Sequence, residues 1–222
     1  MMLVLASNSP RRKQLLALGG WTFSVLPTQI DERPRPGEAP REYVLRLAED
    51  KAHAAASQTP PGEWIVAADT TVADQAIRAG QALQPVMLGK PVDAAEARQM
   101  LRRLRGRTHQ VFTALAVLRA GNGAFLADWC VTDVTMRNYS DAEIEAYVES
   151  GDPFDKAGAY AIQHQEFNPV QELRGCYANV MGLPLCLLAR MFNRLGISSP
   201  GQAQFACLHT PQEHCSITPE MV

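Results

Sequence analysis

Residues 3–18 are LVLASNSPRRKQLLAL, a pattern that predicts a short strand running directly into a helix. The apolar run Leu3 to Ala6 has the length and composition of a buried strand. Ser9 suits the N-cap of the helix and Pro10 its first position, because proline lacks an N–H that would be unpaired there. The helix is expected to end near Gly19 and to bury its three leucines, Leu15, Leu16 and Leu18. This strand-to-helix turn favours the α/β class.

The rest of the chain alternates between apolar runs and helix signals. Trp64 to Ala68 is a continuous apolar run of strand length, and we expect the strand to end at Asp69. Alternating apolar residues from Thr108 to Leu118, a glycine-containing turn and a second extended run through Met136 predict a long hairpin. Apolar stripes, capping residues and terminal glycines predict helices at about 41–57, 93–106, 140–151 and 183–195.

The length of 222 residues fits one large α/β domain better than two equal domains. With 46% hydrophobic and 20% charged residues, the composition is that of a globular protein and excludes a disordered chain. We expect the domain to span residues 1–196, and residues 197–222, rich in Ser, Pro, Gln and His, to form an irregular tail. In this tail a loose segment is favoured over a zinc site, because the spacing of the candidate ligands is unlike that of zinc ligand pairs: Cys207, His209, His214 and Cys215.

Net charge, cysteine spacing and the search for targeting or membrane-spanning segments indicate which partners and which compartment to expect. The apolar start Met1 to Ala6 is too short for a signal peptide, no stretch has the length of a membrane span, and the five cysteines include no CxxC pair. We therefore expect a soluble, cytoplasmic protein that does not bind membranes. The net charge of −2 argues against nucleic acid as a partner, so a polyanionic ligand would have to be held locally. Seventeen of the 21 basic residues are arginine, and the four lysines are Lys13, Lys51, Lys90 and Lys156.

Three groups of residues suggest chemistry, each with a plain alternative. Ser7 to Arg12 combine a helix N-terminus with two guanidinium groups, which favours an anion site, although solvated arginines on a capped surface helix would look the same. Asp69, expected at the carboxyl end of a strand, could hold a divalent cation or orient a water, but aspartate is also common in turns. Lysines in glycine-containing loops could contact phosphate or remain solvated. Carboxylates that could supply oxygen ligands to Mg²⁺ are Glu32, Asp69 and Asp155.

Several ordered motifs resemble those of the Maf family of nucleoside triphosphate pyrophosphatases, over about Leu3 to Leu195. The motifs are LASNSPRRKQLL, the acid pair Asp31-Glu32, YVLRLAEDKA, VAADTTV, LGKP, GRTHQVFT, DKAGAYAIQ and NVMGLPL. The resemblance implies an α/β fold related to inosine-triphosphate pyrophosphatase. That fold has a mixed, highly twisted sheet flanked by helices and two lobes around a cleft.

The resemblance also implies a reaction and its residues. The family hydrolyses a nucleoside triphosphate to the monophosphate and pyrophosphate with a divalent metal, such as Mg, Mn or Co. Asp69 matches the family's catalytic acid, and Glu32 together with Asp69 matches its metal-binding acids. The positions that match the family's phosphate contacts are Ser7, Arg11, Arg12, Lys51 and Lys90. A homodimer is a further family expectation.

Within the family, this chain resembles the branch that acts on dTTP and UTP. The positions that match the specificity set of that branch are Arg11, Thr70 and Gln163. A glutamine amide can present both a donor and an acceptor to the imide edge of a pyrimidine, so the assignment of Gln163 is chemically sensible. An alternative from another class is a nucleotide-binding regulator of cell division with little turnover.

Overall fold

The computed structural model describes residues 3–74, 77–78, 81–82, 85–121 and 123–198. Most of the predicted tail lies outside these residues, including the four residues weighed there as zinc ligands, Cys207, His209, His214 and Cys215. The strands are β1 (Leu3–Leu5), β2 (Phe23–Val25), β3 (Trp64–Asp74), β4 (Ile77–Arg78), β5 (Gln81–Ala82), β6 (Val86–Leu88), β7 (Thr108–Arg119), β8 (Phe125–Met136) and β9 (Val170–Arg174). The α-helices are α1 (Pro10–Leu18), α2 (Pro40–Ala56), α3 (Ala94–Leu104), α4 (Asp141–Glu149), α5 (Tyr177–Val180) and α6 (Leu185–Arg194). Two 3-10 turns follow α4, namely η1 (Asp152–Asp155) and η2 (Ala157–Ala159).

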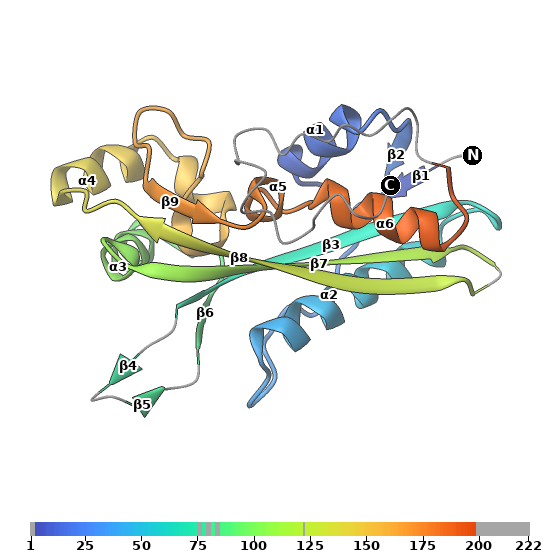
Figure 1. The fold of residues 1–222 in the computed structure, drawn as a ribbon, viewed down its shortest axis with the longest axis horizontal. Helices are drawn as coiled ribbons and strands as arrows, with labels where there is room; N and C mark the ends of the chain where they lie inside the picture. The colour runs from blue at the N-terminus through green and yellow to red at the C-terminus, as the bar shows by residue number, and fades with distance from the viewer. Residues whose placement is uncertain (1–2, 75–76, 79–80, 83–84, 122, 199–222) are drawn as a thin grey trace.

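A seven-stranded mixed sheet forms the centre of the molecule, which confirms the predicted fold class. Its strand order is β2-β1-β3-β7-β8-β9, and β6 pairs with β3 outside this path. β1 pairs in parallel with β2 and β3, whereas the other pairs of this sheet are antiparallel. The long strands β3, β7 and β8 run side by side along the molecule and twist strongly (Figure 1). The predicted hairpin is confirmed in β7 and β8.

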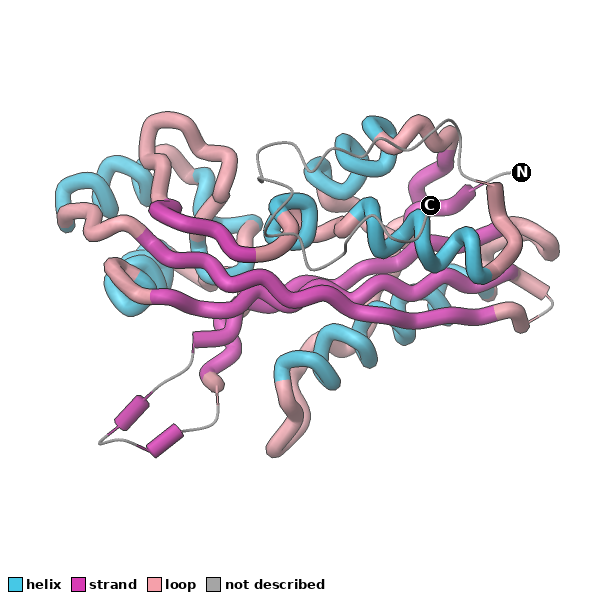
Figure 2. Tube along the Cα trace, in the orientation of Figure 1, coloured by secondary structure: helices cyan, strands magenta, loops and turns pink. Residues whose placement is uncertain are grey.

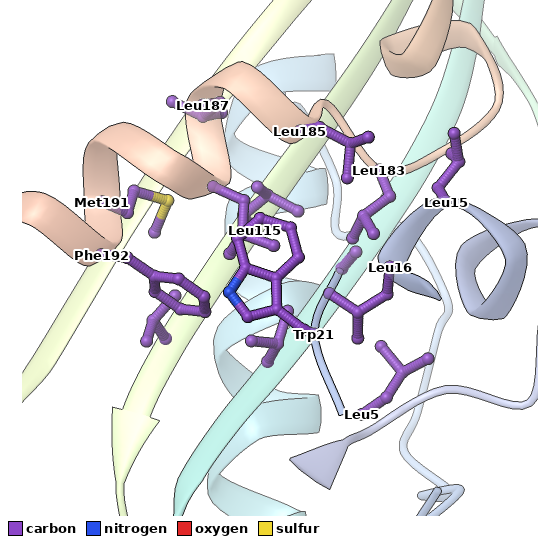
Figure 3. Packing of buried hydrophobic residues seen from close by; sticks show 14 of the residues in the cluster. Leu5, Leu15, Leu16, Trp21, Leu115, Leu183, Leu185, Leu187, Met191 and Phe192 are labelled. Atoms are coloured by element: carbon purple, nitrogen blue, oxygen red, sulfur yellow. The ribbon is translucent and has the colours of Figure 1, made fainter. Parts of the chain in front are cut away.

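Helices cover both faces of this sheet. α2 lies on one face, and α1, α5 and α6 lie on the other (Figure 2). The alternation of side chains along β3 explains this arrangement, since Ile65 and Ala67 pack in the α2 cluster while Val66 and Ala68 pack in the α1–α6 cluster. In the α1–α6 cluster, Trp21 is surrounded by residues of both helices and of β7 (Figure 3). A third cluster at the other end of the sheet joins α3, α4 and η2.

Two predictions about these elements are wrong. Leu18 is 64% exposed, because it lies about 200° around α1 from the buried Leu16. β3 does not end at Asp69 but continues to Asp74, and its pairing with β7 is continuous from Trp64 to Ala73. An aspartate can lie inside this strand because cationic side chains from other elements compensate its charge. No helix in the described part of the chain is long and apolar enough to cross a membrane.

Candidate active site

A cavity of about 610 Å³ opens beside the middle of β3. Its walls come from the β1–α1 loop, the loop before α2, the segment from Asp155 to Gln163 and the turn at Gly182. Every residue predicted from the sequence to bind or act on substrate lines this cavity, namely Ser7, Arg11, Arg12, Glu32, Lys51, Asp69, Thr70, Lys90 and Gln163. The structure therefore brings together residues that are up to 156 positions apart in the chain, from Ser7 to Gln163.

Asp69 is the buried acid of the cavity. Asp69 is only 7% exposed, and its Oδ1 accepts a hydrogen bond of 2.7 Å from Lys51 Nζ. Lys51, on α2, also lies 2.7 Å from Glu32 Oε1, so these two carboxylate oxygens lie no farther apart than twice that distance. Burial raises the pKa of Asp69, although the charges of Lys51 and Arg12 oppose this effect. The result is a carboxylate that holds a proton more readily than an exposed aspartate.

Glu32 is more accessible than Asp69, and its side chain is 55% exposed. Its partial burial would raise its pKa, but the hydrogen bond and charge of Lys51, helped by Lys90 and Arg12, outweigh this and lower it. The two acids of the cavity therefore differ in basicity. Asp69 is suited to accept a proton, and Glu32 is suited to remain an anion.

Arg12 reaches into the cavity from α1 and is held by three neutral oxygen atoms. Its Nε donates to Gly182 O at 2.9 Å, Nη1 to Ser7 Oγ at 3.2 Å and Nη2 to Thr70 Oγ1 at 3.2 Å. Burial lowers the pKa of this guanidinium and the nearby charge of Arg11 adds to the effect, whereas Asp69 opposes it. The site thus contains a fixed cation whose direct partners carry no charge.

Arg11 lies on the same helix but contacts Asp155, in the segment that follows α4. Its Nη1 donates to Asp155 Oδ2 at 2.9 Å and its Nη2 to the Asp155 carbonyl at 3.2 Å. Lys156 does not present a free amine to the cavity, because its Nζ donates to the carbonyl and Oδ1 of Asp152 and to Asp155 Oδ1. Its three N–H donors are all used within η1, so the lysine stabilises this turn. The carboxylate of Asp155 is bound by two cations and does not join Glu32 and Asp69.

Sequence reasoning missed Tyr43 as part of the site. Its hydroxyl donates to the Glu32 carbonyl at 2.8 Å, and burial together with the charges of Asp69 and Glu32 raises its pKa to about 12. Tyr43 and Lys51 are eight residues apart on α2, which is close to two helical turns, so both face the cavity. That spacing is the signal that could have found it. Thr113 contacts Thr70, and Asn179 contacts Thr113. Neither residue could have been found from its spacing in the sequence.

The carboxylates allow a specific mode of metal binding. Among the described residues, no group of three or more His, Cys, Asp or Glu side chains could hold a metal. Mg²⁺, however, is commonly bound by one or two carboxylates together with substrate phosphates. Glu32 and Asp69, which share Lys51 at the wall of one cavity, fit this mode.

The chain is similar to known proteins over most of its length. The family described as "Maf-like protein" matches residues 2–195. The dTTP/UTP pyrophosphatase of Geobacter sulfurreducens is 46% identical over 87% of this chain and 96% of its own length. That of Thermomicrobium roseum is 43% identical over 98% of this chain and 97% of its own length. Among solved structures, the Staphylococcus aureus Ham1 protein covers 62% of this chain and 73% of its own, with 14% identity and a TM-score of 0.39.

Proposed function

The chain belongs to the Maf family, and from this premise we propose that it is a nucleoside triphosphate pyrophosphatase that hydrolyses dTTP and UTP. The products are the nucleoside monophosphate and pyrophosphate, so water attacks at the α-phosphate and the α–β phosphoanhydride bond breaks. The dTTP/UTP pyrophosphatases of Geobacter sulfurreducens and Thermomicrobium roseum support this substrate class, with 46% and 43% identity over most of the chain. Modified pyrimidine triphosphates are further candidates.

One observation carries the proposal, which is the buried Asp69 carboxylate set among cations in a cavity. Its raised pKa makes Asp69 the better base of the two acids, so it accepts a proton from the attacking water. Positive groups around it neutralise charge on the phosphate chain, which is the main help a protein gives to phosphoryl chemistry. The cations assigned to this role are Arg11, Arg12, Lys51 and Lys90, and the neutral hydroxyl of Ser7 is assigned a further phosphate contact.

A divalent metal, with Mg, Mn or Co as the candidates, is the proposed cofactor. Glu32 and Asp69 would hold it, and the metal would supply positive charge at the phosphates and polarise a bound water. Lys51 then has a second function, because it keeps the two carboxylates together before the metal binds.

Base recognition is assigned to Gln163, Arg11 and Thr70, which all line the cavity. The amide of Gln163 can donate and accept, which matches the imide edge of uracil and thymine. Arg11 and Thr70 already have protein partners, Asp155 and Arg12, so their part in specificity depends on those contacts. We further propose that the protein is a cytoplasmic homodimer and that it binds neither nucleic acid nor membranes.

The test is metal-dependent release of pyrophosphate across a panel of nucleoside triphosphates. We expect turnover of dTTP and UTP to exceed that of dCTP, dATP and dGTP, and Asp69→Asn to abolish it. Tight triphosphate binding without turnover in the unmodified protein would favour the nucleotide-binding regulator instead. Undiminished turnover in Asp69→Asn would remove Asp69 from the reaction.

A further inference from the structure

Behind the cavity lies a chain of hydroxyl and carbonyl groups that ends at Arg12. Arg12 Nη2 contacts Thr70 Oγ1 at 3.2 Å, Thr70 Oγ1 contacts Thr113 Oγ1 at 2.9 Å, and Thr113 Oγ1 contacts the Asn179 carbonyl at 2.8 Å. Thr113 and Asn179 are fully buried and belong to β7 and α5. Neither residue lines the cavity, so they act on a ligand through their neighbours. Thr113 contacts Thr70, and the Asn179 backbone carbonyl also accepts a hydrogen bond of 3.0 Å from Gly182 N, next to Arg12.

In this chain of hydrogen bonds, the groups at the two ends determine the direction of every bond. A guanidinium can only donate and a backbone carbonyl can only accept. Thr113 has a single hydroxyl proton, and it goes to the Asn179 carbonyl. In the pair of threonines, Thr113 must therefore accept and Thr70 must donate. The proton of Thr70 consequently points away from the cavity, and Thr70 offers only lone pairs to Arg12 and to a ligand.

Asn179, at the far end of this chain of hydrogen bonds, is itself held in place. The side-chain amide of Asn179 donates through Nδ2 to the Val111 carbonyl at 2.9 Å and to Thr132 Oγ1 at 2.9 Å. Thr132 is in turn bound to the backbone of Cys176, from which it accepts at 3.0 Å and to which it donates at 3.2 Å. The side-chain amide thus anchors Asn179, and its backbone carbonyl, which also accepts from Gly182 N at 3.0 Å, is a fixed group that can only accept.

We propose that Thr113 and Asn179 are positioning residues that hold the Thr70 hydroxyl as an acceptor and thereby fix Arg12 for the phosphate chain. This inference rests on the proposed function for its substrate. It assigns to Thr70 a role through Arg12 in addition to any contact with the base. The same geometry limits Thr70 to recognition of a ligand donor, such as the N3–H of a uracil or thymine ring, and not of an acceptor.

The experiment measures equilibrium binding of inorganic tripolyphosphate, which needs neither a base nor turnover. Thr113→Val, which keeps the side-chain shape without the hydroxyl, is expected to weaken binding about three- to tenfold, as for the loss of one hydrogen bond. Thr113→Ser keeps the hydroxyl and therefore the chain of hydrogen bonds, so this variant should bind tripolyphosphate as the unmodified protein does. Thermal unfolding of each variant identifies any loss of the folded state. If Thr113→Val does not fold, Thr113→Cys replaces it, because a thiol is a weak donor and acceptor.

A double variant separates action through Thr70 from a general structural effect. In a Thr70→Val background, adding Thr113→Val should cause no further loss of tripolyphosphate affinity. An equal loss in both backgrounds would overturn the proposal, as would unchanged affinity in Thr113→Val or no tripolyphosphate binding by the unmodified protein. Failure of the proposed function is a separate outcome, since it would appear as tripolyphosphate binding without hydrolysis of any nucleotide in the panel.

Discussion

Replacing Lys51 by methionine tests whether its ammonium compensates the buried carboxylate of Asp69. The side chains of Lys51 and Asp69 are 11% and 10% exposed, so the variant leaves a buried anion that has lost its closest cation. Removing one partner of a buried ion pair costs about 3–5 kcal/mol. Glu32 adds little to this, because its side chain is 55% exposed and is readily hydrated. We take the lower end, about 3 kcal/mol, because Arg12 still lies near Asp69.

The assay is thermal unfolding by circular dichroism at pH 8 and at pH 5. For a chain of this size, about 3 kcal/mol corresponds to a Tm lower by about 6–12 °C at pH 8. The effect should shrink at pH 5. Burial already raises the pKa of Asp69, and loss of Lys51 raises it further, so the folded variant keeps the proton on Asp69 at a pH where the unfolded chain has lost it. The cost is therefore full above the folded pKa and disappears as the pH falls toward the ordinary value of 3.8.

Two variants control this experiment. Lys13→Met removes an exposed amine that donates to Asn8 Oδ1, and should change the Tm by no more than about 2 °C. Lys51→Met combined with Asp69→Asn removes both charges and should recover most of the lost stability. The reasoning is refuted if the double variant is no more stable than Lys51→Met, or if the Tm difference is the same at both pH values.

Further predictions concern the backbone, a buried histidine and the metal. Gly182→Ala places a Cβ 3.3 Å from Arg12 Nε at a φ of +99°, so KM for substrate should rise about tenfold. Gly151→Ala is the control, because its φ of +77° is similarly strained but no atom lies near the new Cβ, and it should leave KM unchanged. Burial lowers the pKa of His109 to about 4, so stability should fall by about 2–3 kcal/mol as the pH drops from 6.5 to 4.5 in denaturant titrations, and His109→Gln should abolish that loss. Glu32→Gln should weaken Mn²⁺ binding, followed by electron paramagnetic resonance, by at least about tenfold; unchanged binding would remove Glu32 from the metal site.

Local signals predicted the elements that are stabilised locally. The helix that starts at Ser140 has the expected capping box, in which the serine hydroxyl accepts from Glu143 N and the glutamate accepts from Ser140 N. The β7–β8 hairpin likewise follows from alternation and a short turn. β2 and β9 were not predicted, because they are short and largely exposed strands without a clear alternating pattern.

The extension of β3 through Asp69 depends on residues far away in the sequence. Lys51 precedes Asp69 by 18 positions and Arg12 by 57, and an apolar-run rule contains no information about either. Arg11 shows the same limit, since its pairing with Asp155 joins residues 144 positions apart. The candidate site itself was predicted from family motifs. Composition and spacing alone gave an anion site and an acid without showing that they share one cavity.

The arrangement of cations explains how a chain of net charge −2 can hold a triphosphate. Lys51 is paired with two carboxylates and Arg11 with one, so a phosphate group must compete with those acids or share the cation with them. Among the described residues, the hydrogen bonds of Arg12 go to neutral oxygen atoms, and burial lowers its pKa. An anion that enters the cavity therefore gains more at Arg12 than at Lys51 or Arg11, because no ion pair has to break there and the desolvated charge gains a partner. On the proposal made above, the neutral hydrogen-bond chain that holds Arg12 in place contributes to binding in addition to the positive charges.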